Sequence, residues 1–166
     1  MPGDAMINPN TLAVLGVSEP FLGGRGDKCL DSLSSLAGDL GIPFLDLGSL
    51  FGDGPFLIGD TLSVGVSGLQ KRSLILGGGA LEGAVVQTAL TTLLDGYDLF
   101  VPADLFAALE PERSALVFDR IRDVGGIITS ERQILLECLA QTDAPEARAP
   151  LQARFDQLLL QTDGKM

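Results

Sequence analysis

The order of apolar and polar residues along the chain predicts alternating strands and helices. Short apolar runs bounded by Gly, Pro or Asp alternate with longer segments in which apolar residues recur every three or four positions. Continuous apolar strands of this kind are typical of a parallel sheet covered on both faces. We therefore expect a three-layer α/β/α fold around a mainly parallel, Rossmann-like sheet of about six strands. The strand candidates are Leu12 to Val17, Pro43 to Leu47, Phe56 to Ile58, Ser73 to Leu76, Leu99 to Val101 and Gly126 to Thr129.

Helical spacing marks five further segments. Gly41, Gly96 and Gly125 follow three of them, at the place where a helix C-terminus favours glycine. Ser130 and Gln133 match a capping box at the start of another. The segments are Asp27 to Leu40, Leu81 to Leu94, Pro111 up to Gly125, Glu131 to Leu139 and Ala149 to Gln161.

The remaining stretches are interpreted as connections within one domain. We expect residues 1–166 to form a single unit, because two domains would leave each half too small for its own core. Residues 1–10 are expected to be an amino-terminal tail, Gly48 to Gly59 a glycine-rich loop, and Asp143 to Ala149 a linker. Residues 149–162 then form an extra carboxy-terminal helix.

Charge and hydropathy exclude several classes of partner. Eleven Lys and Arg against 22 Asp and Glu give a net charge of −11, which repels phosphate backbones and anionic lipid surfaces. No apolar run reaches the roughly 18 residues of a membrane span, and the first residues lack a signal-peptide pattern. We expect a cytoplasmic protein that binds neither nucleic acid nor membranes.

The chain has no histidine, which removes Ser-His-Asp and Cys-His catalysis and histidine-ligated zinc. Its two cysteines, Cys29 and Cys138, are far apart in sequence and form no metal or redox motif. Buried or idle thiols are the simpler interpretation. We expect no metal and no cofactor.

The sharpest local feature is a strand that runs through three glycines into a helix, from Ser73 to Ala89. Backbone N–H groups at such a turn suit an anion or an oxyanion, and the residues concerned are Gly78, Gly79, Ala80, Glu82 and Gly83. The spacing matches neither a Rossmann fingerprint nor a P-loop. The alternative is that the glycines only permit a tight turn.

This segment resembles the isochorismatase-like cysteine hydrolases, in the branch of small isochorismatase-domain proteins. Gly78, Glu82, Thr88 and Ala89 match the family's spacing, with Ala84 at the position of its nucleophilic cysteine. The resemblance continues through LLDGYDLFVPAD and DRIRDVGGIITSERQILLECL, and through INPNTLAVLGVSEPFL near the amino end. The family aspartate then corresponds to Gly16, and the lysine that precedes a threonine corresponds to Asp60 before Thr61.

The resemblance implies a family fold without the family reaction. In the family reaction a cysteine thiolate attacks a carbonyl or imine carbon, an aspartate acts as the base and a lysine lowers the pKa of the thiol. Gly16, Asp60 and Ala84 supply none of these groups, and we expect both cysteines to lie away from the pocket. We therefore expect no catalytic residue, and a non-catalytic binding or assembly module that forms homo-oligomers, dimers or larger.

Two other interpretations stay open. One is a divergent hydrolase that uses the carboxylates of Asp60 and Glu82 in the same pocket, with Glu19, Tyr97 and Asp104 as further polar candidates. The other is a sensor that keeps the old pocket for a small-molecule ligand.

Overall fold

The computed structural model describes residues 7–17, 24–47, 59–79, 85–106 and 111–163, with the main chain alone at 24–27, 59–62, 111 and 162–163. Within these ranges five strands form one sheet in the order β2-β1-β3-β4-β5. All four neighbouring pairs are parallel. The strands are β1 (Leu12–Gly16), β2 (Phe44–Asp46), β3 (Ser73–Gly77), β4 (Asp98–Pro102) and β5 (Ile127–Thr129).

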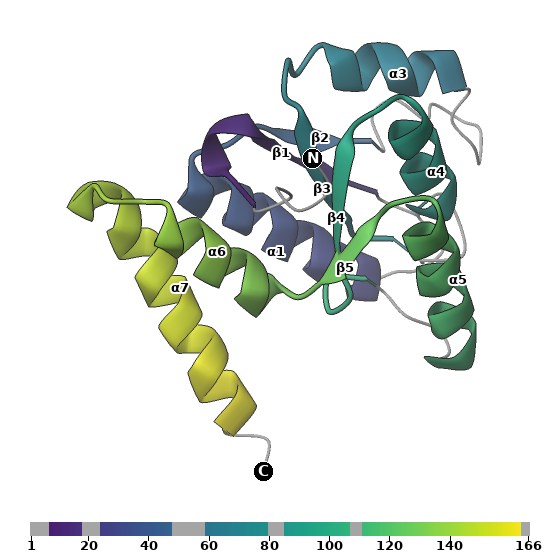
Figure 1. The fold of residues 1–166 in the computed structure, drawn as a ribbon. Coiled ribbons are helices and arrows are strands. Elements are labelled where there is room, and N and C mark those ends of the chain that lie inside the picture. Colours follow the sequence, from purple (N-terminus) through teal and green to yellow (C-terminus); the bar gives the residue numbers. More distant parts are fainter. Residues whose placement is uncertain (1–6, 18–23, 48–58, 80–84, 107–110, 164–166) are drawn as a thin grey trace.

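The predicted α/β/α architecture is confirmed, since helices cover both faces of the sheet (Figure 1). Helices α1 (Gly24–Leu40), α6 (Glu131–Ala140) and α7 (Pro145–Asp163) form one outer layer. Helices α3 (Gly59–Ser67), α4 (Val86–Leu94) and α5 (Pro111–Asp123) form the other, and a short 3-10 helix, Pro9–Thr11, precedes β1. The sixth predicted strand, Phe56 to Ile58, lies outside the described residues.

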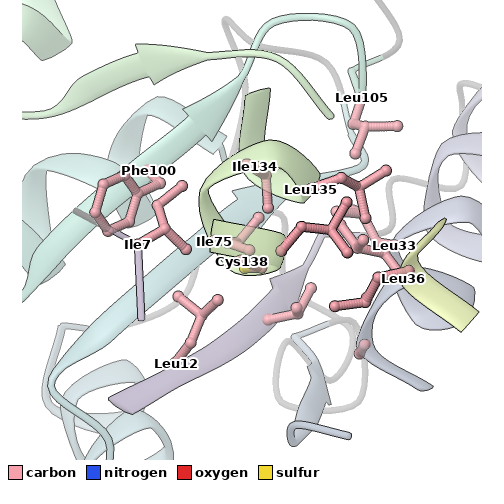
Figure 2. Close-up of a cluster of buried hydrophobic side chains, with 14 residues drawn as sticks. Ile7, Leu12, Leu33, Leu36, Ile75, Phe100, Leu105, Ile134, Leu135 and Cys138 are labelled. Atoms are coloured by element: carbon pink, nitrogen blue, oxygen red, sulfur yellow. The ribbon is translucent and has the colours of Figure 1, made fainter. Parts of the chain in front are cut away.

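Both faces of the central strands are buried, as a doubly covered parallel sheet requires. Every residue of β1 and β3 is buried. One core cluster lies between the sheet and the α3, α4, α5 layer. The second lies between the sheet and the α1, α6, α7 layer, where Leu33 and Leu36 of α1 meet Ile134, Leu135 and Cys138 of α6 (Figure 2).

Three boundaries differ from the sequence predictions. Helix α3 was not predicted, because its sequence GDTLSVGVS contains glycine, serine and β-branched residues and little helical period. Helix α7 begins at Pro145 instead of Ala149, since proline suits the first helical turn, so the linker is shorter than expected. Residues 7–10 are no loose tail, because Ile7 is fully buried and its carbonyl accepts a hydrogen bond from Gln141.

Candidate functional site

Gly16 ends β1 at the carboxyl edge of the sheet, beside the point where the strand order reverses. It pairs with Asp46 of β2 and Gly77 of β3. A Cβ added to Gly16 would lie 2.5 Å from Leu30 Cδ1 and 2.8 Å from Phe44 Cζ. The space that a side chain would need at this position is therefore filled by two apolar side chains from α1 and β2.

The glycine turn after β3 is in tight contact with the end of β1. Gly78 has φ +111°, and a Cβ there would lie 2.5 Å from the Val17 carbonyl oxygen. The N–H of Val17 donates to the Gly77 carbonyl at 2.9 Å, and the N–H of Gly78 donates to the Leu105 carbonyl at 2.8 Å. The predicted oxyanion turn therefore has the amide of Gly78 already occupied, and the close approach to Val17 explains why glycine is required.

The other predicted site residues are only partly described. Gly79 is buried, whereas Ala80, Glu82, Gly83 and the cysteine position Ala84 lie outside the described residues. Asp60 is the second residue of α3, and of this residue only the main chain is described. The proposed pairing of the Asp60 and Glu82 carboxylates accordingly remains a prediction.

Polar groups at the ends of β4 and β5 are used to cap α6. Ser130 is the N-cap and accepts a hydrogen bond from the N–H of Gln133 at 3.2 Å, as predicted. Asp104 accepts from the N–H of Glu131 at 3.0 Å. Carboxylates and hydroxyls at a helix N-terminus satisfy its free amides and complement its dipole, so these groups have a structural role.

Cys29 precedes Leu30, whose side chain lies beside Gly16. It is half-buried in the first turns of α1, next to Leu30, and α1 starts from the carboxyl edge. Burial raises the pKa of the Cys29 thiol, and the nearby Asp104 carboxylate raises it further. Cys138 lies on the buried face of α6, where burial and Glu137 raise its pKa to about 12. Both thiols are therefore protonated near neutral pH and poor nucleophiles.

The buried guanidinium of Arg154 holds α7 against α1 and α6, a contact that was not predicted from the sequence. Nε and Nη2 of Arg154 both lie 2.7 Å from Glu131 Oε1. Its Nη1 contacts Ser35 Oγ at 2.9 Å and Asp39 Oδ2 at 3.1 Å, and Nη2 donates to the Ser32 carbonyl. Arg154 lies on the same helix face as Leu151, Phe155 and Leu158, and an arginine within an apolar stripe was the available signal.

Two hollows among the described residues lie at the opposite, amino-terminal edge of the sheet. One, of about 390 Å³, is formed where α1 and α6 end and α7 begins. The other, of about 340 Å³, is a shallow depression lined by Ser63, Val64, Ser67, Asp95 and Tyr97. Neither includes Gly16, and the second includes Tyr97, one of the further polar candidates.

The described ranges contain neither a metal-binding cluster nor a membrane-spanning helix. No three His, Cys, Asp or Glu side chains there come close enough together to hold a metal ion. None of the described helices combines the length and the apolar character needed to cross a membrane.

Solved structures of low sequence identity share this fold. The YcaC gene product of Escherichia coli, an octameric hydrolase of unknown specificity, matches with a TM-score of 0.72 and 18% identity over 98% of each chain. YcaC from Pseudomonas aeruginosa, with hexane-2,5-diol and covalent acrylamide, gives a TM-score of 0.68 and 16% identity over 96% of this chain and 98% of that one. The MAR1 ribonuclease from Caenorhabditis elegans gives a TM-score of 0.66 and 18% identity over 89% of this chain and 91% of that one.

No family model and no curated protein matches the chain. At these identities the structural likeness establishes the fold, and it does not carry the activities of the similar proteins. The chain has the isochorismatase-like α/β/α fold that its sequence predicted.

Proposed function

We propose that this chain is a non-catalytic protein of isochorismatase-like fold that acts as a binding or assembly module. The observation that carries the proposal is the surroundings of Gly16. The resemblance assigns the catalytic aspartate to this position, and here the ends of the apolar Leu30 and Phe44 side chains lie 2.5 Å and 2.8 Å from where its Cβ would be. A buried carboxylate among apolar side chains would also lose its hydration without a partner.

The lack of a reactive nucleophile supports the same proposal. The resemblance places Ala84 at the cysteine position, and neither cysteine of the chain offers a thiolate near neutral pH. Without histidine, no neutral-pH imidazole base is present to activate a hydroxyl. The loss of a single triad residue lowers kcat by about 10⁴- to 10⁶-fold, and loss of the nucleophile lies at the upper end.

Homo-oligomer formation is the second part of the proposal. The Escherichia coli YcaC gene product, which matches over 98% of each chain, is an octamer. A protein of this fold without catalytic activity can still function by assembling with copies of itself or by binding a ligand. We therefore propose that the chain forms a dimer or a larger assembly. We carry over no RNA chemistry from the MAR1 ribonuclease, since a net charge of −11 repels phosphate.

Reaction with acrylamide tests the absence of a nucleophile. The folded chain is incubated with acrylamide near neutral pH, and its intact mass is measured over time. We expect no more than slow addition at half-buried Cys29, while the same chain in denaturant adds acrylamide rapidly at both Cys29 and Cys138 because their thiols are then exposed. Rapid modification of the folded chain at a single residue would contradict the proposal.

Turnover and ligand binding are tested separately. A panel of amide, ester and isochorismate-like substrates is assayed with the natural chain and with an Asp60→Asn, Glu82→Gln double variant. Turnover that disappears in the double variant would establish the divergent hydrolase instead. Thermal-shift screening with metabolites separates the sensor from the scaffold, and light scattering gives the assembly size; no ligand together with a monodisperse monomer would refute both binding roles.

A further inference from the structure

We infer that the outer part of α7 is a strap that opens and closes on the domain, and that its closure is coupled to the carboxyl edge of the sheet. The strap consists of residues 151–163, with Pro150 as its hinge and Arg154 as its latch. Glu131 connects the latch to the carboxyl edge. The inference goes beyond the proposed function, since it concerns a motion within one chain and needs neither a ligand nor a partner.

The strap is attached to the domain through one narrow face. Figure 1 shows α7 on the outside of its layer, with its carboxyl end projecting beyond the other helices. Its principal contacts are with α1 and α6. Leu151 is buried, and Phe155 and Leu158 are partly buried against the same cluster, whereas most other described side chains of the strap are exposed. Segments with few buried apolar contacts open locally before the whole domain unfolds.

Pro150 separates the strap from a first turn that is firmly held. Proline has no N–H, so the Glu146 carbonyl loses the helical donor that any other residue would supply at position 150. Before the proline, Nη1 of Arg148 donates to the Leu139 carbonyl at the end of α6 and to the Thr142 carbonyl, the second at 2.9 Å. Because the helix is fixed before Pro150 and weakened at it, it bends most readily there.

The latch is a cation among carboxylates from three parts of the domain. Arg154 pairs with Glu131 of α6 at 2.7 Å and with Asp39 of α1 at 3.1 Å. Burial raises the pKa of Glu131, Arg154 lowers it, and Asp104 and Asp39 raise it further. When the strap opens, these three carboxylates remain near one another without that guanidinium. Closure of the strap therefore stabilises the charges of the underlying layer as well as the strap itself.

Glu131 carries the effect of the latch to the carboxyl edge of the sheet. It is the first residue of α6, and its N–H donates at 3.0 Å to Asp104, which follows β4. A carboxylate that is 6% exposed and has lost its counter-charge is unstable where it lies, so Glu131 moves toward solvent when the latch opens. This movement shifts the first turn of α6. The opening of the strap therefore loosens the contact between α6 and Asp104.

Native-state hydrogen exchange of the full chain tests the strap. We expect the amides of residues 152–158 to exchange as one group, at least about 100-fold faster than those of β3 and with a weaker urea dependence, because a local opening exposes less surface. Arg154→Lys keeps the charge but loses the planar fork, and it should accelerate exchange of this group by about tenfold or more. Gln152→Ala is the matched control, because it removes an exposed contact with Asp156 on the same helix and should change exchange less than about threefold.

The same measurement tests the coupling at the start of α6. The amides of Glu131 and Gln133 should share the urea dependence of the strap and should accelerate with it in Arg154→Lys, but not in Gln152→Ala. Amides at these two positions that follow β3 instead, or that do not respond to Arg154→Lys, overturn the coupling. Residues 152–158 that exchange as slowly as β3, or with rates that rise steadily toward the end of the helix as in simple fraying, overturn the strap.

Discussion

Replacement of Arg154 by alanine should destabilise the domain more than any surface ion pair can. The side chain of Arg154 is 13% exposed and that of its partner Glu131 is 6% exposed. Alanine would leave the Glu131 carboxylate buried without its counter-charge, and it would remove donors to Ser35 and to the Ser32 carbonyl. Breaking one side of a buried ion pair typically costs about 3 to 5 kcal/mol.

The contact with Asp39 adds little to this figure, because the Asp39 side chain is 34% exposed and solvent screens it. For a domain of this size each kcal/mol lowers the melting temperature by about 2 to 4 °C, so a decrease of roughly 6 to 20 °C is expected. Far-UV circular dichroism is the suitable probe, since the chain has no tryptophan and one tyrosine. Urea titration of the same samples gives the free energy of unfolding.

Two further variants make the test specific. Arg122→Ala removes an ion pair with Asp119 whose side chains are 54% and 67% exposed, and it should have almost no effect on stability. An Arg154→Met, Glu131→Gln double variant removes both charges and should recover most of the loss. If Arg154→Ala proved no more destabilising than Arg122→Ala, the assignment of a buried electrostatic anchor for α7 would be wrong.

The cost of Arg154→Ala should also depend on pH. Burial raises the pKa of Glu131 above its ordinary value of 4.5, and Arg154 opposes the rise. Without Arg154 the folded-state pKa rises further, so the folded variant binds a proton that the unfolded chain has already released. Stability of the variant therefore falls as pH rises through the raised pKa. The loss should be largest at neutral pH and should shrink as pH falls toward 4.5.

Three other predictions concern the carboxyl edge and the cysteines. Replacement by alanine should destabilise the domain most at Gly78, less at Gly77 and least at Gly16. An added Cβ meets backbone atoms at Gly78, which also has a positive φ, it meets the Leu105 carbonyl at 2.8 Å at Gly77, and it meets only side-chain ends at Gly16. Thermal melting of the three variants checks the order. Thiol labelling of the folded chain should accelerate with rising pH at half-buried Cys29 well before Cys138, whose pKa is about 12; equal rates would place both thiols in equivalent environments. Cys138→Ser should lower stability by about 1 to 3 kcal/mol in urea titration, since it buries a hydroxyl in an apolar cluster, and a neutral result would mean that the hydroxyl finds a partner.

The local pattern of apolar and polar residues was sufficient to predict the fold. Five predicted strands coincide with the sheet, because continuous apolar runs between Gly, Pro and Asp have few alternatives in a domain of this length. Helix α3 escaped prediction because its glycines and β-branched residues favour no helix by themselves, and packing of Val66 into the core stabilises it. Tertiary burial overrides local propensity at such a segment.

The candidate site was less predictable, because its decisive contacts join distant parts of the chain. Gly16 was identified from motif spacing, but the side chains that fill its surroundings come from α1 and β2. The Arg154 network joins residues separated by 23 to 122 positions, and no local pattern specifies such partners.

The crowding at Gly16 also determines the order in which substitutions around it are best introduced. A variant that introduces any side chain at this position first meets Leu30 and Phe44, so it begins from an overpacked core. Shortening Leu30 or Phe44 beforehand opens the space at the cost of a small cavity, which the new side chain then fills. A route of single substitutions therefore loses least stability when it starts on α1 or β2 and reaches β1 last.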